Sequence, residues 1–369
     1  KVDLSVGVYQ DEAGHTPILE CVRIAEQQIL KEQSTKSYVG IAGNVGFNER
    51  MEALLFGDNH PARRAGRISS VQTPGGSGGL CVAGHCLVRA KPDAQVWLSD
   101  PSWPNHLPLL RLSGLNLKQY SYYDYENHCI NFESMTATFN ELSYGDVVLL
   151  HGCCHNPCGA DLSQDQWNVL TNIFKERGIV PFIDLAYQGL SEGLEEDAYG
   201  VRLMAEKLDE IIVVTSCSKN LGLYRERVGM TSLVSKDEGQ AKAVQSTLGN
   251  VARGIYSMPP DHGAAVAGRV LSDRKLHQLW VQELGEMRTR LNTFRKLFVE
   301  KTKERNAPRD FSFIAREKGM FSFLGLSREQ VIQLREEFHI YMLESSRINI
   351  AGINQSNIDY VADSIVAVL

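Results

Sequence analysis

One lysine stands where it could form a covalent bond to a carbonyl compound. The stretch Ile211–Thr215 is apolar and rich in β-branched residues, which predicts a buried strand, and Ser216, Ser218 and Lys219 follow it. An amine in that place can form a Schiff base, while neighbouring hydroxyl groups can hold a phosphate. The plainer interpretation is a surface lysine after a core strand, and Lys219 taken alone would favour it.

A glycine-rich turn provides a second potential anion site. The predicted strand Arg67–Thr73 leads into Pro74–Gly79, and a helix of small and apolar residues is predicted from Leu80. Free backbone N–H groups and the helix dipole at such a helix start attract an anion. The spacing fits neither GxGxxG nor GxxxxGK[ST]. A phosphate site around Gly76 and Ser77 and a merely flexible turn therefore both remain open.

Asp184 ends another apolar strand, predicted over residues 179–184. A carboxylate there either caps a helix or pairs with a buried cation. A pyridinium nitrogen is such a cation, and an aspartate that keeps it protonated lets the ring of pyridoxal phosphate (PLP) act as an electron sink. Tyr187 and Asn156 could hydrogen-bond the phenolic oxygen of that ring. Arg227 could pair with the phosphate, or it could be a solvated arginine at a helix end.

Three further side chains could position a substrate. Trp103 follows a predicted strand and could stack on an aromatic ring, although a core tryptophan fits its context nearly as well. Arg347 lies in an apolar, β-like context where a lone arginine is unusual, and its planar guanidinium could bind a carboxylate through two hydrogen bonds. Arg253 is a weaker candidate for a second carboxylate, since an isolated arginine is usually a surface residue.

The elements that must position these residues alternate along the chain. Apolar strands are predicted at residues 95–99, 146–151, 179–184 and 211–215, with helices between them. This alternation predicts an α/β fold with a mostly parallel sheet that helices cover on both faces. Ligands of such sheets bind outside the carboxyl ends of the strands. Because the polar clusters fall at those ends, the sequence predicts one common site there.

The last third of the chain has a different pattern. It is helical and interleaved with charge through about residue 303, and it ends in short elements that predict a small α+β domain. The expected short strands are 311–314, 320–323 and 347–350, the expected helices lie near 328–337 and 355–368, and the N-terminal strand is expected to join them. We expect a large cofactor-binding domain over residues 17–286 and a small domain formed by residues 1–16 and 287–369.

Composition excludes several classes of protein. The chain has 369 residues and a net charge of −6, so it has no basic footprint for nucleic acid, and no apolar run is long enough to cross a bilayer. The eight cysteines are scattered except for Cys153, Cys154 and Cys158, which suggests buried thiols in a reducing compartment. We expect no metal site, since no second CxxC or HxxxH unit supports one. A cytoplasmic location is expected, with organellar targeting left open because the chain begins at Lys1.

Taken together, the motifs resemble the class I aspartate aminotransferases, which are PLP enzymes of fold type I. The matching segments occur in the order of that family from one end of the chain to the other: VDLSVGVY, QTPGGSG, DPSWPNH, HGCCHNPCG, IDLAYQG, SCSKNLGLYRERVG, YSMPP, GMFS and SSRINIAG. The resemblance implies a seven-stranded, mostly parallel sheet in a large domain, a smaller α+β domain, and a homodimer with shared active sites.

The resemblance also implies a role for each candidate residue. Lys219 would carry the cofactor and shuttle the proton, assisted by Asp184, Tyr187 and Trp103. The cofactor would contact Gly76, Ser77, Trp103, Asn156, Asp184, Tyr187, Ser216, Ser218, Lys219, Arg227 and Tyr38 of the partner subunit. The substrate would contact Gly7, Trp103, Asn156, Arg347, which takes the α-carboxylate, and Arg253 of the partner subunit, which takes the side-chain carboxylate.

The expected activity is transamination of L-aspartate with 2-oxoglutarate, giving oxaloacetate and L-glutamate by a ping-pong mechanism. An aromatic or broad-specificity aminotransferase of the same branch is the alternative, and a PLP-binding protein without transaminase activity is a further one. An NAD-dependent dehydrogenase is disfavoured by the lack of a GxGxxG turn. Four positions depart from the family pattern, namely Cys158, Cys217, Met258 and Ser346. Met258 and Ser346 are expected near the substrate, which leaves the side-chain preference open.

Overall fold

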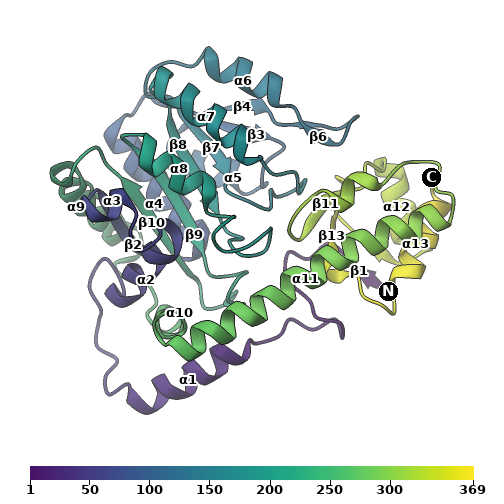
Figure 1. The fold of residues 1–369 in the computed structure, drawn as a ribbon, viewed down its shortest axis with the longest axis horizontal. Coiled ribbons are helices and arrows are strands. Elements are labelled where there is room, and N and C mark those ends of the chain that lie inside the picture. Colours follow the sequence, from purple (N-terminus) through teal and green to yellow (C-terminus); the bar gives the residue numbers. More distant parts are fainter.

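A seven-stranded sheet forms the centre of the computed structural model, which describes residues 1–369 (Figure 1). Its strands, in spatial order, are β2 (Ile68–Pro74), β10 (Val228–Val234), β9 (Ile211–Ser216), β8 (Val180–Leu185), β7 (Val147–His151), β3 (Gln95–Asp100) and β4 (Asn116–Ser121). Strand β10 is antiparallel to both neighbours, and the other pairs are parallel. The predicted α/β fold with a mostly parallel sheet is confirmed.

Helices cover both faces of this sheet (Figure 1). Those that contact its strands include α2 (Val45–Phe56), α4 (Gly75–Ala90), α5 (His106–Leu112), α6 (Phe132–Asn140), α8 (Tyr199–Lys207) and α9 (Glu238–Tyr256). The other helices of this part of the chain are α1 (Glu20–Glu32), α3 (Pro61–Arg64), α7 (Gln164–Arg177) and α10 (His262–Ser272), which pack against neighbouring helices. Side chains along β9 alternate between two cores, with Ile212 and Val214 in one and Ile211 and Val213 in the other. A strand buried on both faces has no polar alternation, which is why it reads as a continuous apolar run.

Helix α4 begins at Gly75, earlier than the predicted start at Leu80. Glycine is a poor helix former, but these positions are needed for close packing. A Cβ on Gly79 would lie 2.6 Å from Val214 Cγ1, so only glycine lets the helix approach the sheet this closely. The first turn of α4 therefore lies directly over the carboxyl end of β9.

Helix α11 (Arg274–Glu304) joins the sheet to a smaller group of elements, in which both termini lie (Figure 1). Asp273 caps its start by accepting hydrogen bonds from the backbone N–H groups of Lys275 and Leu276. The helix is continuous through residue 286, so the proposed domain division at that residue stays a prediction. None of the helices combines the length and the apolar character that a membrane crossing needs.

The smaller group is held together by two short strand pairs. Strands β11 (Phe321–Phe323) and β13 (Arg347–Asn349) pair antiparallel, and β1 (Val2–Asp3) pairs with β12 (Ile340–Tyr341) in parallel. The second pair confirms that the N-terminal strand joins this group. Its helices are α12 (Arg328–Glu337), α13 (Ile358–Ala367) and the 3-10 turns η1 (Ser312–Ala315) and η2 (Ile350–Gly352). A separate hairpin of β5 (Tyr123–Asp124) and β6 (Cys129–Ile130) follows strand β4 of the large sheet.

The strand predicted at residues 311–314 is wrong, because η1 occupies this stretch. Phe311, Phe313 and Ile314 are buried, and the alternation of Phe311 and Phe313 about Ser312 resembled a strand. The carboxylate of Asp310 accepts a hydrogen bond from the Ser312 N–H at 2.8 Å. Such a local side-chain bond competes with extended backbone and favours a turn.

Candidate active site

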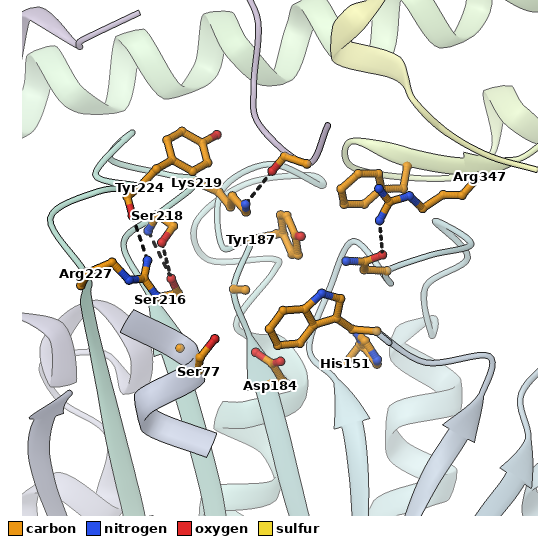
Figure 2. A pocket seen from close by; sticks show the side chains of 16 residues that line it. Ser77, His151, Asp184, Tyr187, Ser216, Ser218, Lys219, Tyr224, Arg227 and Arg347 are labelled. Carbon is orange, nitrogen blue, oxygen red and sulfur yellow. Dashed lines mark hydrogen bonds between the residues drawn. The ribbon is translucent and has the colours of Figure 1, made fainter. Parts of the chain in front are cut away.

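A cavity of about 370 Å³ lies at the carboxyl ends of the parallel strands (Figure 2). Of the predicted site residues, only Tyr38 and Arg253 do not line it. Those that do are Gly7, Gly76, Ser77, Trp103, Asn156, Asp184, Tyr187, Ser216, Ser218, Lys219, Arg227 and Arg347. The expectation of one common site at this edge is therefore met in the geometry, while the role of each residue stays a prediction.

Lys219 follows β9 and extends into this cavity (Figure 2). Its Nζ donates a hydrogen bond to the carbonyl oxygen of Gly7 at 2.7 Å and lies 4.7 Å from the centre of the Tyr224 ring. Burial, assisted by the positive charges of Arg227 and Arg347, lowers the pKa of Lys219 to about 8. A substantial fraction of this amine is therefore neutral near physiological pH and able to act as nucleophile or base.

One end of the cavity is built to receive an anion. Ser216 and Ser218 are bonded to each other there, with 3.1 Å between their Oγ atoms. The first turn of α4 and the guanidinium of Arg227 face the same space. Gly75 has a φ of +70°, and a Cβ at this position would collide with the Arg227 guanidinium. Arg227 donates to the carbonyl oxygen of Tyr224 at 2.8 Å and forms no ion pair, so its charge is uncompensated within this chain.

Asp184 lies at the floor of the cavity, near the end of β8 (Figure 2). Its Oδ2 is 2.9 Å from Nε2 of His106, whose Nδ1 is 2.8 Å from the Ser102 hydroxyl. His106 is completely buried, and its ring meets the Trp103 ring edge-on. Because Oδ1 forms no hydrogen bond with the protein, it is free to accept one from a ligand in the cavity.

Tyr187 lies between Lys219 and Arg347 (Figure 2), and Asn156 lines the same cavity. Burial, together with the charge of Asp184, raises the pKa of Tyr187 above its usual range, so its phenol stays protonated. The Tyr187 hydroxyl has no hydrogen-bond partner in the protein, whereas Asn156 Oδ1 accepts one from Arg347 at 3.3 Å. Tyr187 is therefore available as a donor to a ligand oxygen.

Arg347 is the second uncompensated cation of the cavity. Its guanidinium lies over the Phe321 ring at 4.2 Å and donates to the carbonyl oxygen of Ser5 at 2.8 Å. Its Nε is buried without a partner, and the side chain forms no ion pair. An orphaned N–H on a buried, half-satisfied guanidinium is the arrangement that a bound carboxylate would complete.

Tyr38 and Arg253 lie apart from this cavity. The side chain of Tyr38 is 93% exposed, and Arg253 is exposed on α9. A position outside this chain's own site is compatible with service in the site of a partner subunit. Their contribution from a partner stays a prediction.

The four departures from the family pattern do not line the cavity. Cys217 is fully buried, and Cys158 Sγ lies 3.2 Å from Nδ1 of the buried His155. Ser346 has a φ of +68°, and its hydroxyl accepts a hydrogen bond from the Leu326 N–H at 2.9 Å. Within one chain, Cys158, Cys217 and Ser346 lie in the protein interior, whereas Met258 is partly exposed.

Four lining residues had no role in the sequence prediction, namely His151, Ala186, Tyr224 and Phe321. Tyr224 lies under the Lys219 amine, and its hydroxyl accepts a hydrogen bond from the Tyr9 N–H at 2.8 Å. Both Tyr224 and Phe321 fall inside segments that carried the resemblance, SCSKNLGLYRERVG and GMFS. Their aromatic side chains, within segments already assigned to the site, could have identified Tyr224 and Phe321 as lining residues from the sequence.

Known proteins match the whole of this chain. A family model described as aminotransferase class I and II matches residues 1–365. The aspartate aminotransferase of Salmonella typhi is 46% identical over 100% of this chain and 93% of its own length. The aromatic-amino-acid aminotransferase of Paracoccus denitrificans is 42% identical, again with 100% and 93% covered.

One solved structure also matches this chain over its whole length. The aromatic-amino-acid aminotransferase of Burkholderia pseudomallei, covalently bound to pyridoxal phosphate, matches with a TM-score of 0.98 at 43% identity, covering 100% of this chain and 92% of that one. Whole-length matches of this kind, together with a cavity built around Lys219 and Asp184, confirm the resemblance. The chain belongs to the class I and II aminotransferase family.

Proposed function

We propose that this aminotransferase uses PLP to transfer the amino group of L-aspartate to 2-oxoglutarate, giving oxaloacetate and L-glutamate. The observation that carries the proposal is a pair of arginines, Arg227 and Arg347, without ion-pair partners on opposite sides of one cavity, with Lys219 between them (Figure 2). Such a cavity suits a phosphate at one end and a substrate carboxylate at the other. The aspartate preference is supported by the relative at 46% identity.

The residues present fit PLP. Arg227, the two serines and the first turn of α4 offer donors to a phosphate, and Oδ1 of Asp184 offers an acceptor to a protonated pyridine nitrogen. The unpartnered Tyr187 hydroxyl offers a donor to the phenolic oxygen. When bound, PLP supplies a carbonyl carbon to which an amine can attach and a ring that withdraws electrons from the substrate Cα.

The protein's own part is then to bind, orient and move a proton. Arg347, which lines the cavity, would hold the α-carboxylate through its guanidinium N–H groups and so place the amino acid between itself and Lys219. The Lys219 Nζ, with its lowered pKa, would accept the proton from Cα. His106, hydrogen-bonded to Asp184 Oδ2, would keep that carboxylate oriented. The second half of the reaction reuses the same groups, so ping-pong kinetics are expected.

A homodimer with shared sites is part of the proposal. Apolar side chains are strongly exposed at Leu30, Tyr38 and Val45, within one N-terminal stretch. Exposed apolar residues gathered in this way support a surface that a second copy covers. In such a dimer, Tyr38 and Arg253 of the partner subunit would reach the phosphate and the side-chain carboxylate. The cytoplasmic location expected from the sequence stays a prediction.

The aromatic alternative is favoured by one observation, the TM-score of 0.98 to an aromatic-amino-acid aminotransferase. Comparing kcat/KM for L-aspartate and L-phenylalanine with purified holoenzyme separates the two. We expect aspartate to be preferred by at least tenfold, that is by about 1.4 kcal/mol. A preference for phenylalanine would refute the aspartate proposal and leave the aminotransferase assignment intact.

A further inference from the structure

A buried carboxylate outside the cavity is surrounded by hydrogen-bond donors. Glu317 is 4% exposed, and no role has so far been assigned to it. Its Oε1 accepts a hydrogen bond from the Tyr123 hydroxyl at 3.1 Å, and its Oε2 accepts one from the Ser322 hydroxyl. Arg295 Nη1 lies 3.6 Å from the same Oε2. The two hydroxyl groups donate hydrogen bonds to this carboxylate and Arg295 places a positive charge beside it, which is the environment of an ionised carboxylate.

Arg295 has no other charged partner. It lies on α11, is 1% exposed, and forms an ion pair with Glu317 alone. Its N–H groups donate to the Ser322 hydroxyl at 2.6 Å and to backbone carbonyl oxygens, including those of Lys318 at 3.0 Å and Phe321 at 2.6 Å. A buried guanidinium needs a counter-charge. Glu317 and Arg295 together therefore fix the path of the chain from residue 317 to residue 321.

This path leads directly into the cavity. The Phe321 ring supports the Arg347 guanidinium at 4.2 Å and meets Tyr187 edge-on with 6.2 Å between ring centres. The backbone of Lys318 donates to the carbonyl oxygen of Gly159 at 2.7 Å, in the loop that carries Asn156. A shift of residues 317–321 would therefore move both Arg347 and Asn156, which lie at the proposed carboxylate site.

Tyr123 links this cluster to the other lobe of the protein. It lies on the separate two-stranded hairpin of β5 and β6, which follows strand β4 of the large sheet and extends toward the smaller group of elements (Figure 1). The Tyr123 hydroxyl has a second possible partner in its own hairpin, since Nδ1 of His128 lies at 3.3 Å. A protonated Glu317 is a weaker acceptor, so a gained proton would weaken its hydrogen bond from Tyr123 in favour of the one to His128.

Glu317 can gain this proton near neutral pH. Burial raises the pKa of Glu317 to about 7, while Arg295, Ser322, Tyr123 and Arg316 act in the opposite direction. The other titratable groups that act on the cluster are His128, whose pKa is lowered by burial, Cys154 and Cys158, whose pKa values are raised by burial, and Asp161, whose pKa is raised by burial to about 6. His128 and the two cysteines carry no charge in their shifted forms near neutral pH. Asp161 is a carboxylate at pH 8 and acts on Arg295 rather than on Glu317 directly.

We propose that Glu317 is a positioning residue for substrate binding: as a carboxylate it ties Tyr123 to Arg295 and Ser322, and thereby holds Phe321 beneath the Arg347 guanidinium. The inference rests on the proposed function, in which Arg347 binds the substrate α-carboxylate. It adds that ligand affinity is set partly by a group that does not touch the ligand.

The test replaces the carboxylate by an amide of the same shape. Holoenzymes of wild type, Glu317→Gln and Tyr123→Phe are compared at pH 6 and pH 8, by KM and kcat for L-aspartate and by calorimetric Kd for succinate and 3-phenylpropionate. At pH 8, Glu317→Gln should raise KM and both Kd values about threefold or more, with kcat within about twofold of wild type. At pH 6 the difference should shrink, because Glu317 of the wild type is then largely protonated. Tyr123→Phe should likewise raise KM and both Kd values at pH 8, with a smaller difference from wild type at pH 6.

The control is Glu192→Gln, which breaks the exposed ion pair of Glu192 with Lys318 at 3.1 Å on the same side of the molecule. Exposed pairs contribute little, so no change is expected. Equal Kd values for wild type and Glu317→Gln at pH 8, or an increase that is the same at both pH values, would overturn the inference. A wild type that binds 3-phenylpropionate but not succinate would instead refute the aspartate preference, and the Glu317 comparison would still be decided with 3-phenylpropionate.

Discussion

Replacing Arg347 by lysine tests the geometry of the carboxylate site most sharply. The guanidinium is held by the Phe321 ring, by Asn156 Oδ1 and by the Ser5 carbonyl oxygen, and its Nε has no partner in the protein. A lysine ammonium keeps the positive charge but cannot form two parallel hydrogen bonds or stack on a ring in the same way. The substitution therefore removes the planar hydrogen-bonding geometry of the side chain while keeping its positive charge.

The expected loss follows from what the substitution leaves unpaired. Truncating one partner of a buried, hydrogen-bonded charge pair costs about 2–5 kcal/mol, which is about 30-fold to several thousandfold in kcat/KM. The loss should be similar for aspartate and phenylalanine, since both carry the α-carboxylate. It should appear mainly in KM, because the groups around Lys219 are untouched.

The assay is steady-state kinetics of the holoenzyme with both amino acids. Arg335→Lys serves as a matched control, because Arg335 is an exposed arginine of the smaller group whose nearest acidic oxygens lie at 3.7 Å. This control should retain wild-type kcat/KM. A value for Arg347→Lys within threefold of wild type, or a loss confined to aspartate, would refute the role of Arg347 as the α-carboxylate site.

Three further predictions concern the lysine, the anion site and the buried carboxylate. Cofactor-free protein should bind PLP covalently at a rate that rises with pH through about 8, because Lys219 loses its proton there; a flat stopped-flow profile between pH 6 and 9 would contradict this. Gly75→Ala should weaken PLP affinity by about tenfold or more, since a Cβ displaces the Arg227 guanidinium and φ is +70°. Gly285→Ala, on the open side of α11, is its control in the same equilibrium titration. The pKa of Glu317 is about 7 in the folded chain and lies above the ordinary glutamate value of 4.5, so between these pH values the folded state holds a proton that the unfolded chain has lost. The free energy of unfolding should therefore fall as pH rises through this window, by at most about 3 kcal/mol from this group, and denaturant titrations of Glu317→Gln should lack this component.

The sequence predicted well those features that depend on local pattern. Strands β3, β7, β8 and β9 are apolar runs followed by polar residues, and their parallel pairing necessarily brings Asn156, Asp184 and Lys219 to one edge. Strand β10 was not among the predicted strands. Its antiparallel place between β2 and β9 depends on contacts distant in sequence, which local propensity does not encode.

Other features could not be predicted, because they depend on side chains that meet only in the folded chain. The contact of His106 with Asp184 joins residues far apart in sequence, and so does that of Glu317 with Tyr123. The strand predicted at 311–314 is instead the 3-10 turn η1 (Ser312–Ala315), because the hydrogen bond from the Ser312 N–H to Asp310 outweighs the apolar alternation. The role of Phe321 likewise follows only from the contact of its ring with the Arg347 guanidinium, which the folded chain creates.

The visible absorption spectrum of the purified holoenzyme, recorded before and after adding L-aspartate, tests the central claim most directly. We predict a yellow protein whose absorption band is lost with aspartate and restored by 2-oxoglutarate, and a Lys219→Ala variant that shows neither change at the wild-type rate. A band that responds to phenylalanine alone would move the assignment to the aromatic enzymes. A protein that cannot be loaded with PLP, or a Lys219→Ala variant that turns over like wild type, would contradict the account.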